Sequence, residues 1–208
     1  MSLDKVRIEL GDCIRCPLHQ TRTNIVFGVG NPQADILLVG EGPGANEDQQ
    51  GEPFVGQAGH LLNRLLEKAG LARSEVYIAN VVKCRPPGNR DPKPEEVHEC
   101  LPFLTAQIKA IQPRILVTLG KHATWYMTNL YGPMGALYDN TSLVYRGDTS
   151  IPVVALYHPS YLLRQGKGER AQKLIKEAVV KLKGAREKVK LQGDLSDTVS
   201  DEVLGTHL

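Results

Sequence analysis

Four short runs of apolar, β-favouring residues recur along the chain, at residues 35–40, 76–82, 114–120 and 152–157. Each run is almost continuously apolar and does not alternate with polar residues, which is typical of strands buried on both faces of a parallel sheet. The runs therefore predict four parallel strands.

Helical patterns separate these runs, because apolar residues recur there at spacings of three and four. The first two stripes consist of Leu61, Leu62, Leu65, Leu66 and Ala69, and of Val97, Leu101, Leu104, Ile108 and Ile111. Pro102 is expected to kink the second helix. A shorter helix is predicted over residues 121–130, and a last one over residues 171–182 has lysines opposite its apolar face. Strands that alternate with helices predict an α/β fold, a three-layer sandwich with a central four-stranded parallel sheet.

The length of 208 residues predicts one domain with an appendage, because a domain averages roughly 150 residues. We expect the domain to span residues 1–183 and a polar, flexible tail to span residues 184–208, where no apolar stripe is sustained. No apolar run approaches the roughly 18 residues that cross a bilayer, and the first residues lack the apolar stretch of a signal peptide. The expectation is a cytoplasmic protein without a membrane segment.

Basic residues concentrate late in the chain, although the net charge is only +2. Residues 164–190 carry ten basic and three acidic side chains, whereas the residues before them are nearly balanced. Such a stretch is attracted to a polyanion such as nucleic acid, but a solvated, lysine-rich helix face explains it almost equally well.

Glycines and polar residues lie near or after the end of each predicted strand: GEGPG at residues 40–44, Asn80 near the end of the second strand, and residues 120–122 and 158–160. Ligands of an open parallel sheet bind beyond the carboxyl ends of its strands, so we expect these segments to share one crevice. GEGPG matches neither a Walker loop nor GxGxxG, which disfavours a phosphate-binding loop. Its glycines suit close approach to a flat ligand, although a plain turn is the simpler interpretation.

Three single residues near these segments each have two interpretations. Phe54 is a ring on which a base stacks, or it fills the core. Asn80 is unusual in an apolar strand and either reads a ligand or belongs to a structural network, because a buried amide needs partners. His158 either donates to an oxygen on which charge develops or is a structural residue.

The four cysteines are Cys13, Cys16, Cys84 and Cys100. Four thiols in this arrangement favour a metal over disulfides in a cytosolic chain, and both a zinc site and an iron–sulfur cluster suit thiolates. Free structural cysteines are the alternative. Three basic residues, Lys83, Arg85 and Arg90, share the irregular segment around Cys84, so a metal site there would order a loop that holds phosphates.

Taken together, the motifs resemble the family 4 uracil-DNA glycosylases, the iron–sulfur members of the uracil-DNA glycosylase superfamily. The resemblance covers roughly residues 8 to 183. It rests on the order and spacing of GEGPG, GEPFVGQAGHLL, NVVKCRPPGNRDP, ECLPFL and HPSYLLR.

The resemblance implies roles for individual residues. The four cysteines match the ligands of a structural 4Fe-4S cluster. The pocket residues that it implies are Gly40, Glu41 and Gly42 in the loop around uracil, Phe54 as the stacking ring, Asn80 as the reader of the uracil edge, and His158 facing uracil O2. The water-activating aspartate of the family 1 enzymes falls at Gly42, so this duty passes to Glu41 or Glu47, or becomes dispensable.

The segment of residues 160–164 looks like the loop that enters DNA where the base leaves. Leu162 or Leu163 fills the vacated stack, and Ser160, Arg164 and Arg85 lie near the DNA strand. The implied activity is that of a monomeric, monofunctional enzyme that flips uracil out of single- or double-stranded DNA and hydrolyses the N-glycosidic bond, leaving free uracil and an abasic site. The alternatives are a non-catalytic four-cysteine nucleic-acid-binding module and a nucleotide-binding enzyme.

Overall fold

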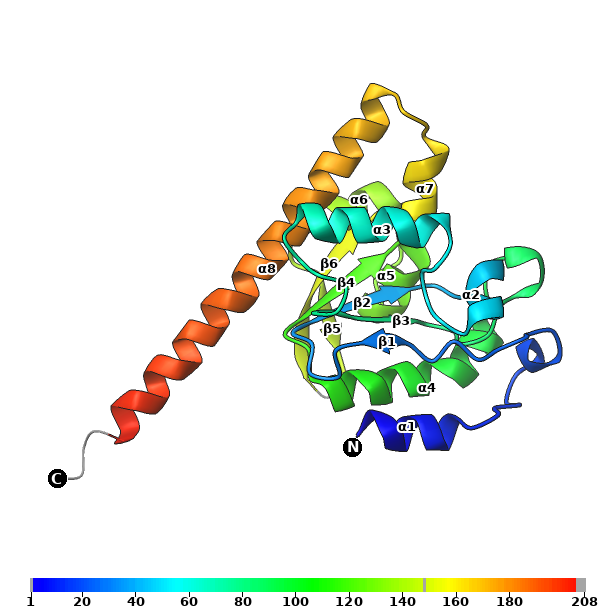
Figure 1. The fold of residues 1–208 in the computed structure, drawn as a ribbon, viewed down its shortest axis with the longest axis horizontal. Helices are drawn as coiled ribbons and strands as arrows, with labels where there is room; N and C mark the ends of the chain where they lie inside the picture. The colour runs from blue at the N-terminus through cyan, green and yellow to red at the C-terminus, as the bar shows by residue number, and fades with distance from the viewer. Residues whose placement is uncertain (1, 148, 205–208) are drawn as a thin grey trace.

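A computed structural model describes residues 2–147 and 149–204 of the chain. A six-stranded sheet lies between two sets of helices, and the strand order is β1-β3-β2-β4-β6-β5 (Figure 1). This arrangement is the expected α/β three-layer sandwich.

The four predicted strands form the parallel centre of the sheet. They are β2 (Ile36–Gly40), β3 (Tyr77–Asn80), β4 (Ile115–Leu119) and β6 (Ser150–Leu156). The strands that follow β2 in sequence lie on opposite sides of it, β3 on one side and β4 on the other. Such a switch point opens a crevice at the carboxyl end of the sheet.

Two short edge strands extend the predicted four-stranded sheet to six. β1 (Val29–Gly30) pairs antiparallel with β3, and β5 (Val144–Arg146) pairs antiparallel with β6. Their two and three residues are too few for a hydrophobic pattern, and backbone hydrogen bonds to the neighbouring strand define them. The four central parallel strands are confirmed, but the sheet has two additional antiparallel strands at its edges that were not predicted.

Each face of the sheet supports its own core, because side chains alternate along a strand. On β2, Leu37 and Val39 belong to the cluster that includes α4 (Pro94–Ile111) and α5 (Lys121–Thr128). Ile36 and Leu38 belong to the opposite cluster with α3 (Gln57–Lys68) and α8 (Glu169–Leu204). All of these β2 side chains are buried, which explains why the strand reads as a continuous apolar run.

The helix α4 carries the amino-terminal segment. Pro102 lies inside α4, which continues past it as one element to Ile111. The helix α1 (Leu3–Leu10) packs on α4 through a small cluster of Val6, Leu10, Phe27 and Phe103. The amino terminus is thereby placed beside the helix that bears Cys100.

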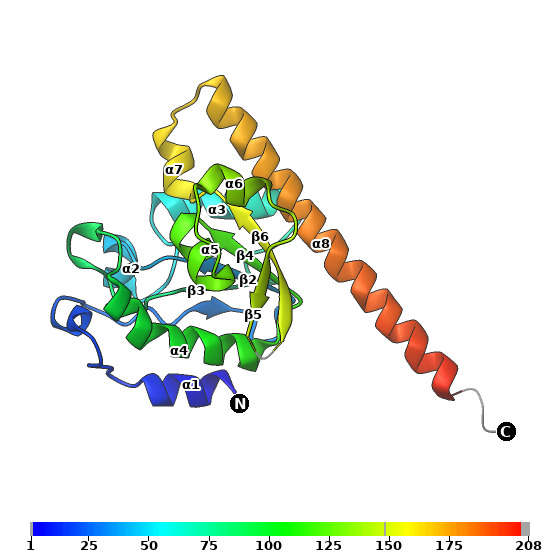
Figure 2. The ribbon, with the colours of Figure 1, turned by 180° about the vertical axis from the view of Figure 1, so that it is seen from behind.

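The helix α8 continues past Gly184 to Leu204, through residues that the sequence led us to expect as a flexible tail. Ala185 is buried, and Arg114 Nη1 donates to the Val189 carbonyl 3.1 Å away, so this part of the tail packs on the domain. The last turns extend beyond the sheet (Figures 1 and 2), and residues 205–208 lie outside the described residues. No helix within the described part of the chain is both long and apolar enough to span a bilayer.

Five short helices lie in the connections between the longer elements. They are η1 (Pro17–Gln20), α2 (Ala45–Gln50), η2 (Pro87–Asn89), α6 (Met134–Asp139) and α7 (Pro159–Arg164). The loop that follows β2 leads into α2, and the loop that follows β6 leads into α7. Both connections bring side chains to the edge where the crevice opens.

Candidate active site

A cavity of about 860 Å³ opens at the carboxyl ends of the four parallel strands. Its lining residues include Glu41, Gly42, Glu47, Phe54, Asn80, Lys121, His122, His158, Ser160 and Arg164. The segments that follow the predicted strands therefore do share one crevice, as the switch-point rule requires.

Gly40 lies beside Asn80 in the paired ends of β2 and β3. A Cβ atom at Gly40 would come within 2.3 Å of Asn80 Oδ1 and within 2.7 Å of Phe54 Cε2. Only glycine leaves room for the Asn80 amide and the Phe54 ring to meet here. The glycine thus shapes one wall of the cavity without carrying a functional group.

Asn80 has a buried side chain whose Oδ1 accepts no hydrogen bond within the described part of the protein. Leaving a buried acceptor without a donor costs about 1–3 kcal/mol. Its backbone carbonyl, in contrast, accepts from Lys83 Nζ at 2.8 Å. The side chain is therefore held in the cavity wall with an acceptor available for a donor on a ligand.

Phe54 is both a core residue and a residue of the cavity wall. Its backbone is left-handed, with φ of 54°, and a Cβ atom at Gly59 would lie only 1.8 Å from the Phe54 carbonyl oxygen. The first turn of α3 therefore packs directly on the Phe54 backbone. The Phe54 and His158 rings face the same space, with centroids 5.7 Å apart and planes tilted by 36°.

His158 caps the short helix α7. Its Nδ1 accepts from the Ser160 backbone N–H at 3.1 Å and lies 2.7 Å from Ser160 Oγ. Because a backbone N–H can only donate, Nδ1 is an acceptor, and the proton of the neutral ring resides on Nε2. Desolvation lowers the pKa of His158 to about 4, so the ring is a neutral donor near pH 7.

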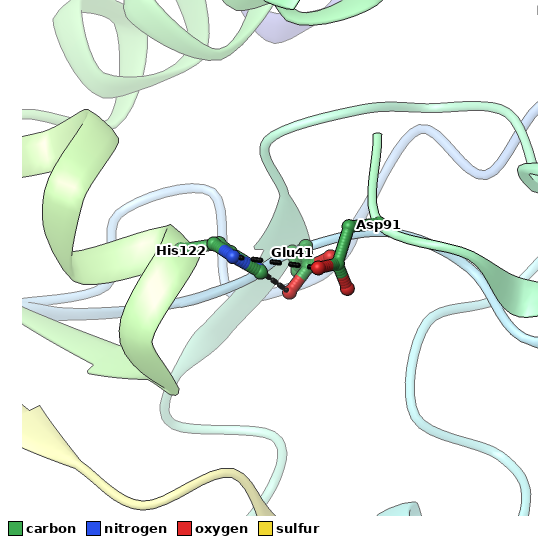
Figure 3. Close-up of side chains that lie close together, drawn as sticks. All are labelled: Glu41, Asp91 and His122. Atoms are coloured by element: carbon green, nitrogen blue, oxygen red, sulfur yellow. Dashed lines mark hydrogen bonds and ion pairs between the residues drawn. The ribbon is translucent and has the colours of Figure 1, made fainter. Parts of the chain in front are cut away.

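Glu41 belongs to a cluster with Asp91 and His122 at the cavity wall (Figure 3). His122 Nδ1 lies 2.8 Å from Glu41 Oε2, and His122 Nε2 lies 3.6 Å from Asp91 Oδ2. The hydrogen bond with Glu41 is the main reason that the pKa of His122 is raised. The sequence places His122 after β4 but gives no sign of this pairing, because the partners are far apart along the chain.

Glu47 also lines the cavity, but backbone donors occupy both of its carboxylate oxygens. Oε2 accepts from Gly44 N at 3.1 Å, and Oε1 accepts from Val55 N and Gly56 N, each at 2.9 Å. These bonds fasten the loop that carries Phe54 to the start of α2. The contacts of Glu47 indicate a positioning role in the pocket.

The segment of residues 160–164 forms α7 and divides between the core and the rim. Leu162 is only 1% exposed and packs in the cluster with α3, so its burial disfavours it as the leucine, of the two expected, that enters the DNA stack. Leu163 is 38% exposed. Arg164 Nη1 donates to Ser160 Oγ at 3.3 Å, and both residues line the cavity. One face of a single helical turn must pack inward, which separates the two neighbouring leucines.

The three basic residues around Cys84 lie in different environments. Lys83 is completely buried and donates to Gln107 Oε1 at 2.6 Å, so it is no phosphate ligand, contrary to the expectation. Arg90 forms a bidentate pair with Glu96. Arg85 is partly exposed and Nε donates to Asn89 Oδ1 at 2.8 Å. Of the three expected phosphate ligands, Arg85 keeps the most freedom to meet DNA.

The four cysteines are all free thiols, contributed by the α1–η1 connection, the loop after β3 and the helix α4. Burial is the main cause that raises the pKa of the Cys100 thiol, and the nearby Cys16 and Cys13 raise it further. Burial also raises the pKa of the Cys84 thiol, to about 12, and the nearby Cys100 and Cys16 raise it further. Cys100 therefore lies close enough to each of the other three thiols for their charges to interact.

Hydrogen-bond donors face two of these sulfurs. Arg22 Nη1 lies 3.6 Å from Cys84 Sγ, and the Lys83 backbone N–H donates to Cys100 Sγ at 3.2 Å. Such donors stabilise thiolates, the form in which cysteine binds metal. The four cysteines, from three segments of the chain, offer the thiolate ligands that metal centres use, and no three of their sulfurs lie within 4.8 Å of one another.

The model of the Uracil DNA glycosylase superfamily matches residues 27–183, which carry the whole parallel sheet and the cavity. The chain belongs to this superfamily. Among similar proteins of the superfamily, the Type-4 uracil-DNA glycosylase of Archaeoglobus fulgidus is 46% identical over 170 residues, which cover 78% of this chain and 83% of the relative.

Two further Type-4 uracil-DNA glycosylases show the same extent of similarity. That of Sulfurisphaera tokodaii is 46% identical over 171 residues, which cover 78% of this chain and 76% of the relative. That of Thermotoga maritima is 44% identical over 171 residues, which cover 82% of this chain and 88% of the relative. The superfamily member described here is therefore similar to Type-4 enzymes over most of both chains.

Proposed function

We propose that this protein removes uracil from DNA by hydrolysing the N-glycosidic bond, which releases free uracil and leaves an abasic site. The observation that carries the proposal is the unpartnered, buried Asn80 Oδ1 in a cavity that also presents Phe54, His158 and Glu41. The three similar proteins described above are named Type-4 uracil-DNA glycosylases, which supports the same activity.

Asn80 reads the base in this proposal. Its Oδ1 accepts from uracil N3–H, and its amide N–H donates to O4. Cytosine presents an acceptor and a donor at these two positions, so its binding would leave buried polar groups unpaired, and a site of this kind rejects such a base strongly. The flat ring lies against Phe54, where Gly40 allows the close approach.

His158 stabilises the leaving uracil anion. Cleavage leaves negative charge on the ring, and the neutral His158 has its Nε2–H available because Ser160 occupies Nδ1. A donor that is already oriented toward developing charge contributes about 3 kcal/mol. A neutral donor also avoids the cost of burying a second charge.

Glu41 orients the attacking water and offsets the positive charge that develops on the sugar. We assign this role to Glu41 and not to Glu47, because three backbone N–H groups occupy the Glu47 oxygens. Glu41 shares one oxygen with His122 and keeps the other free of any hydrogen bond within the described residues. Glu47 holds the Phe54 loop in place.

We infer that Cys13, Cys16, Cys84 and Cys100 hold a 4Fe-4S cluster. When bound, the cluster supplies metal–thiolate bonds that join three segments of the chain. The four free thiols and the N–H donors to sulfur support a metal centre, and a zinc ion is the alternative with the same ligands. Broad visible absorption and iron content in anaerobically purified protein distinguish the cluster from colourless zinc.

DNA approaches the mouth of the cavity in this proposal, and the target nucleotide leaves the stack to enter it. Leu163 fills the vacated position, and Arg164, Ser160 and Arg85 contact the strand at the rim. The substrates are single- or double-stranded DNA that contains uracil. The monomeric state and the cytoplasmic location expected from the sequence stay predictions.

The activity is tested with a labelled oligonucleotide that contains one uracil. The enzyme converts it to a strand that breaks at the uracil position in alkali, and free uracil appears in equal amount. Asn80→Asp lowers the preference for uracil over cytosine at least tenfold. Binding without alkali-labile breaks would indicate a nucleic-acid-binding module, and unchanged base preference in the variant would contradict the role of Asn80.

A further inference from the structure

A row of aromatic rings leads from the cavity wall to the surface of the protein. The His122 ring contacts Trp125 edge to face, with centroids 5.1 Å apart, and Trp125 lies 5.6 Å from Tyr131. His122 binds Glu41 inside the cavity, whereas Tyr131 is 71% exposed. Among the Phe, Trp and Tyr side chains in the described part of the chain, Tyr131 alone is exposed.

A positive charge accompanies this row. Lys121 Nζ lies over the Trp125 ring, 4.6 Å from its centroid, and Lys121 also lines the cavity. The aromatic row therefore begins at the cavity, and the Lys121 ammonium lies over its middle ring, Trp125. Aromatic side chains with adjacent cations are the surfaces on which successive bases of single-stranded nucleic acid stack.

The backbone that carries Tyr131 is fixed by local hydrogen bonds. Trp125 Nε1 donates to the Gly132 carbonyl at 2.9 Å, and the Leu130 N–H donates to Thr128 Oγ1 at 3.2 Å. Asn129 ends α5 in a left-handed conformation, with φ of 56°. The exposed ring is thus presented by an ordered turn, and its position serves no core cluster.

We propose that Tyr131, Trp125 and Lys121 form a stacking platform for a nucleobase that flanks the extruded uridine in the DNA strand. The proposal rests on the proposed function, since the cavity must receive a nucleotide of that strand. The platform binds unpaired bases, because a paired base has both faces stacked in the duplex. The surface therefore favours single-stranded DNA over double-stranded DNA.

The platform is continuous with the cavity through Lys121 and His122, which favours DNA as its occupant over an unrelated protein. A strand whose nucleotide enters the cavity must pass over the rim, and the nearest exposed ring on the α5 side is Tyr131. The Lys121 ammonium attracts the phosphates of the same strand.

The first test measures binding of single- and double-stranded oligonucleotides that carry a stable abasic-site analogue in place of deoxyuridine. Tyr131→Ala weakens the affinity for the single strand about tenfold, from the loss of one stacked base, and weakens affinity for the duplex less. Tyr131→Phe keeps the ring and restores the affinity to within about twofold. Leu130→Ala, in the adjacent and 46% exposed residue, is the matched control and changes affinity less than twofold.

The second test uses fluorescence, because Trp125 is the one tryptophan of the chain. Its emission decreases when single-stranded DNA without uracil is added, and the decrease is smaller in Tyr131→Ala. Neither measurement depends on catalysis. If uracil is released normally but Tyr131→Ala binds the single strand as wild type does, the platform is wrong and the proposed function stands.

Two other outcomes also overturn the platform. One is a lowered melting temperature in Tyr131→Ala with unchanged DNA affinity, which would show that the ring serves the fold. The other is an equal loss of affinity in Leu130→Ala, which would assign the effect to the turn and not to the ring. Absence of uracil release from every substrate, with normal quenching of Trp125, would instead contradict the proposed function alone.

Discussion

Replacing Gly40 with alanine should damage base recognition without adding any polar group. The new Cβ would lie 2.3 Å from Asn80 Oδ1 and 2.7 Å from Phe54 Cε2, whereas ordinary van der Waals contacts lie at 3.4–4 Å. The backbone cannot retreat easily, because the Gly40 carbonyl accepts from Val81 N at 2.9 Å. The Asn80 amide, the Phe54 ring or both must therefore move by about 1 Å.

The expected loss follows from this displacement. A misplacement of 1 Å in a positioned group lowers the rate about 100-fold, which corresponds to about 2.7 kcal/mol of transition-state stabilisation. Overpacking also costs about 1–3 kcal/mol of folding stability. We expect kcat/KM for uracil release to fall about 100-fold in Gly40→Ala, while the melting temperature falls by several degrees.

The assay is single-turnover release of uracil from a labelled oligonucleotide, together with thermal unfolding of the same samples. Gly168→Ala is the matched control, because a Cβ there meets no atom within 4 Å and the backbone φ is not positive. It should leave both quantities nearly unchanged. A folded Gly40→Ala protein that releases uracil at the normal rate would refute the assignment of Asn80 and Phe54 to the base pocket.

Further predictions concern charge, packing and the metal centre. The hydrogen bond to Glu41 raises the pKa of His122. The folding stability that this bond contributes is therefore complete below about pH 6.5 and is lost as the pH rises through the raised pKa. His122→Gln should make the melting temperature depend less on pH in this range. Leu162→Ala should cost about 2–5 kcal/mol of folding stability in denaturant titrations, whereas Leu163→Ala should cost under about 1 kcal/mol and slow release from duplex DNA. Cys100→Ala should lower iron content and melting temperature together, and an unchanged iron content would exclude Cys100 as a ligand.

The centre of the sheet could be predicted from the sequence because its strands are buried on both faces. In β2 every residue is buried, so the apolar run marks the strand directly. The edge strand β1 has only two residues, too few for a pattern. The apolar spacing of α8 continues past Gly184 at Ala185 and Val189, but the surrounding polar residues make this stripe hard to recognise. Edges and helix ends depend on tertiary contacts more than on local composition.

The site divides in the same way. A position at or just beyond the end of a strand can be predicted from the sequence, and both Asn80 and His158 line the cavity as that position requires. The hydrogen-bond partners of a side chain could not be predicted, because they depend on how the loops fold. Glu47 accepts from three backbone N–H groups, and His122 pairs with Glu41, which lies 81 residues away in the sequence. The inward turn of Leu162 likewise depends on where α7 docks.

The close packing of the Phe54 carbonyl against Gly59 matters for redesign of this enzyme. Because a Cβ at residue 59 would overlap that carbonyl, the backbone of the loop and the first turn of α3 are locked together. A smaller side chain at residue 54 therefore enlarges the room for a base while the loop stays where it is. Variants that accept bulkier damaged bases should be sought by changing the side chain at residue 54, with Gly59 kept as it is.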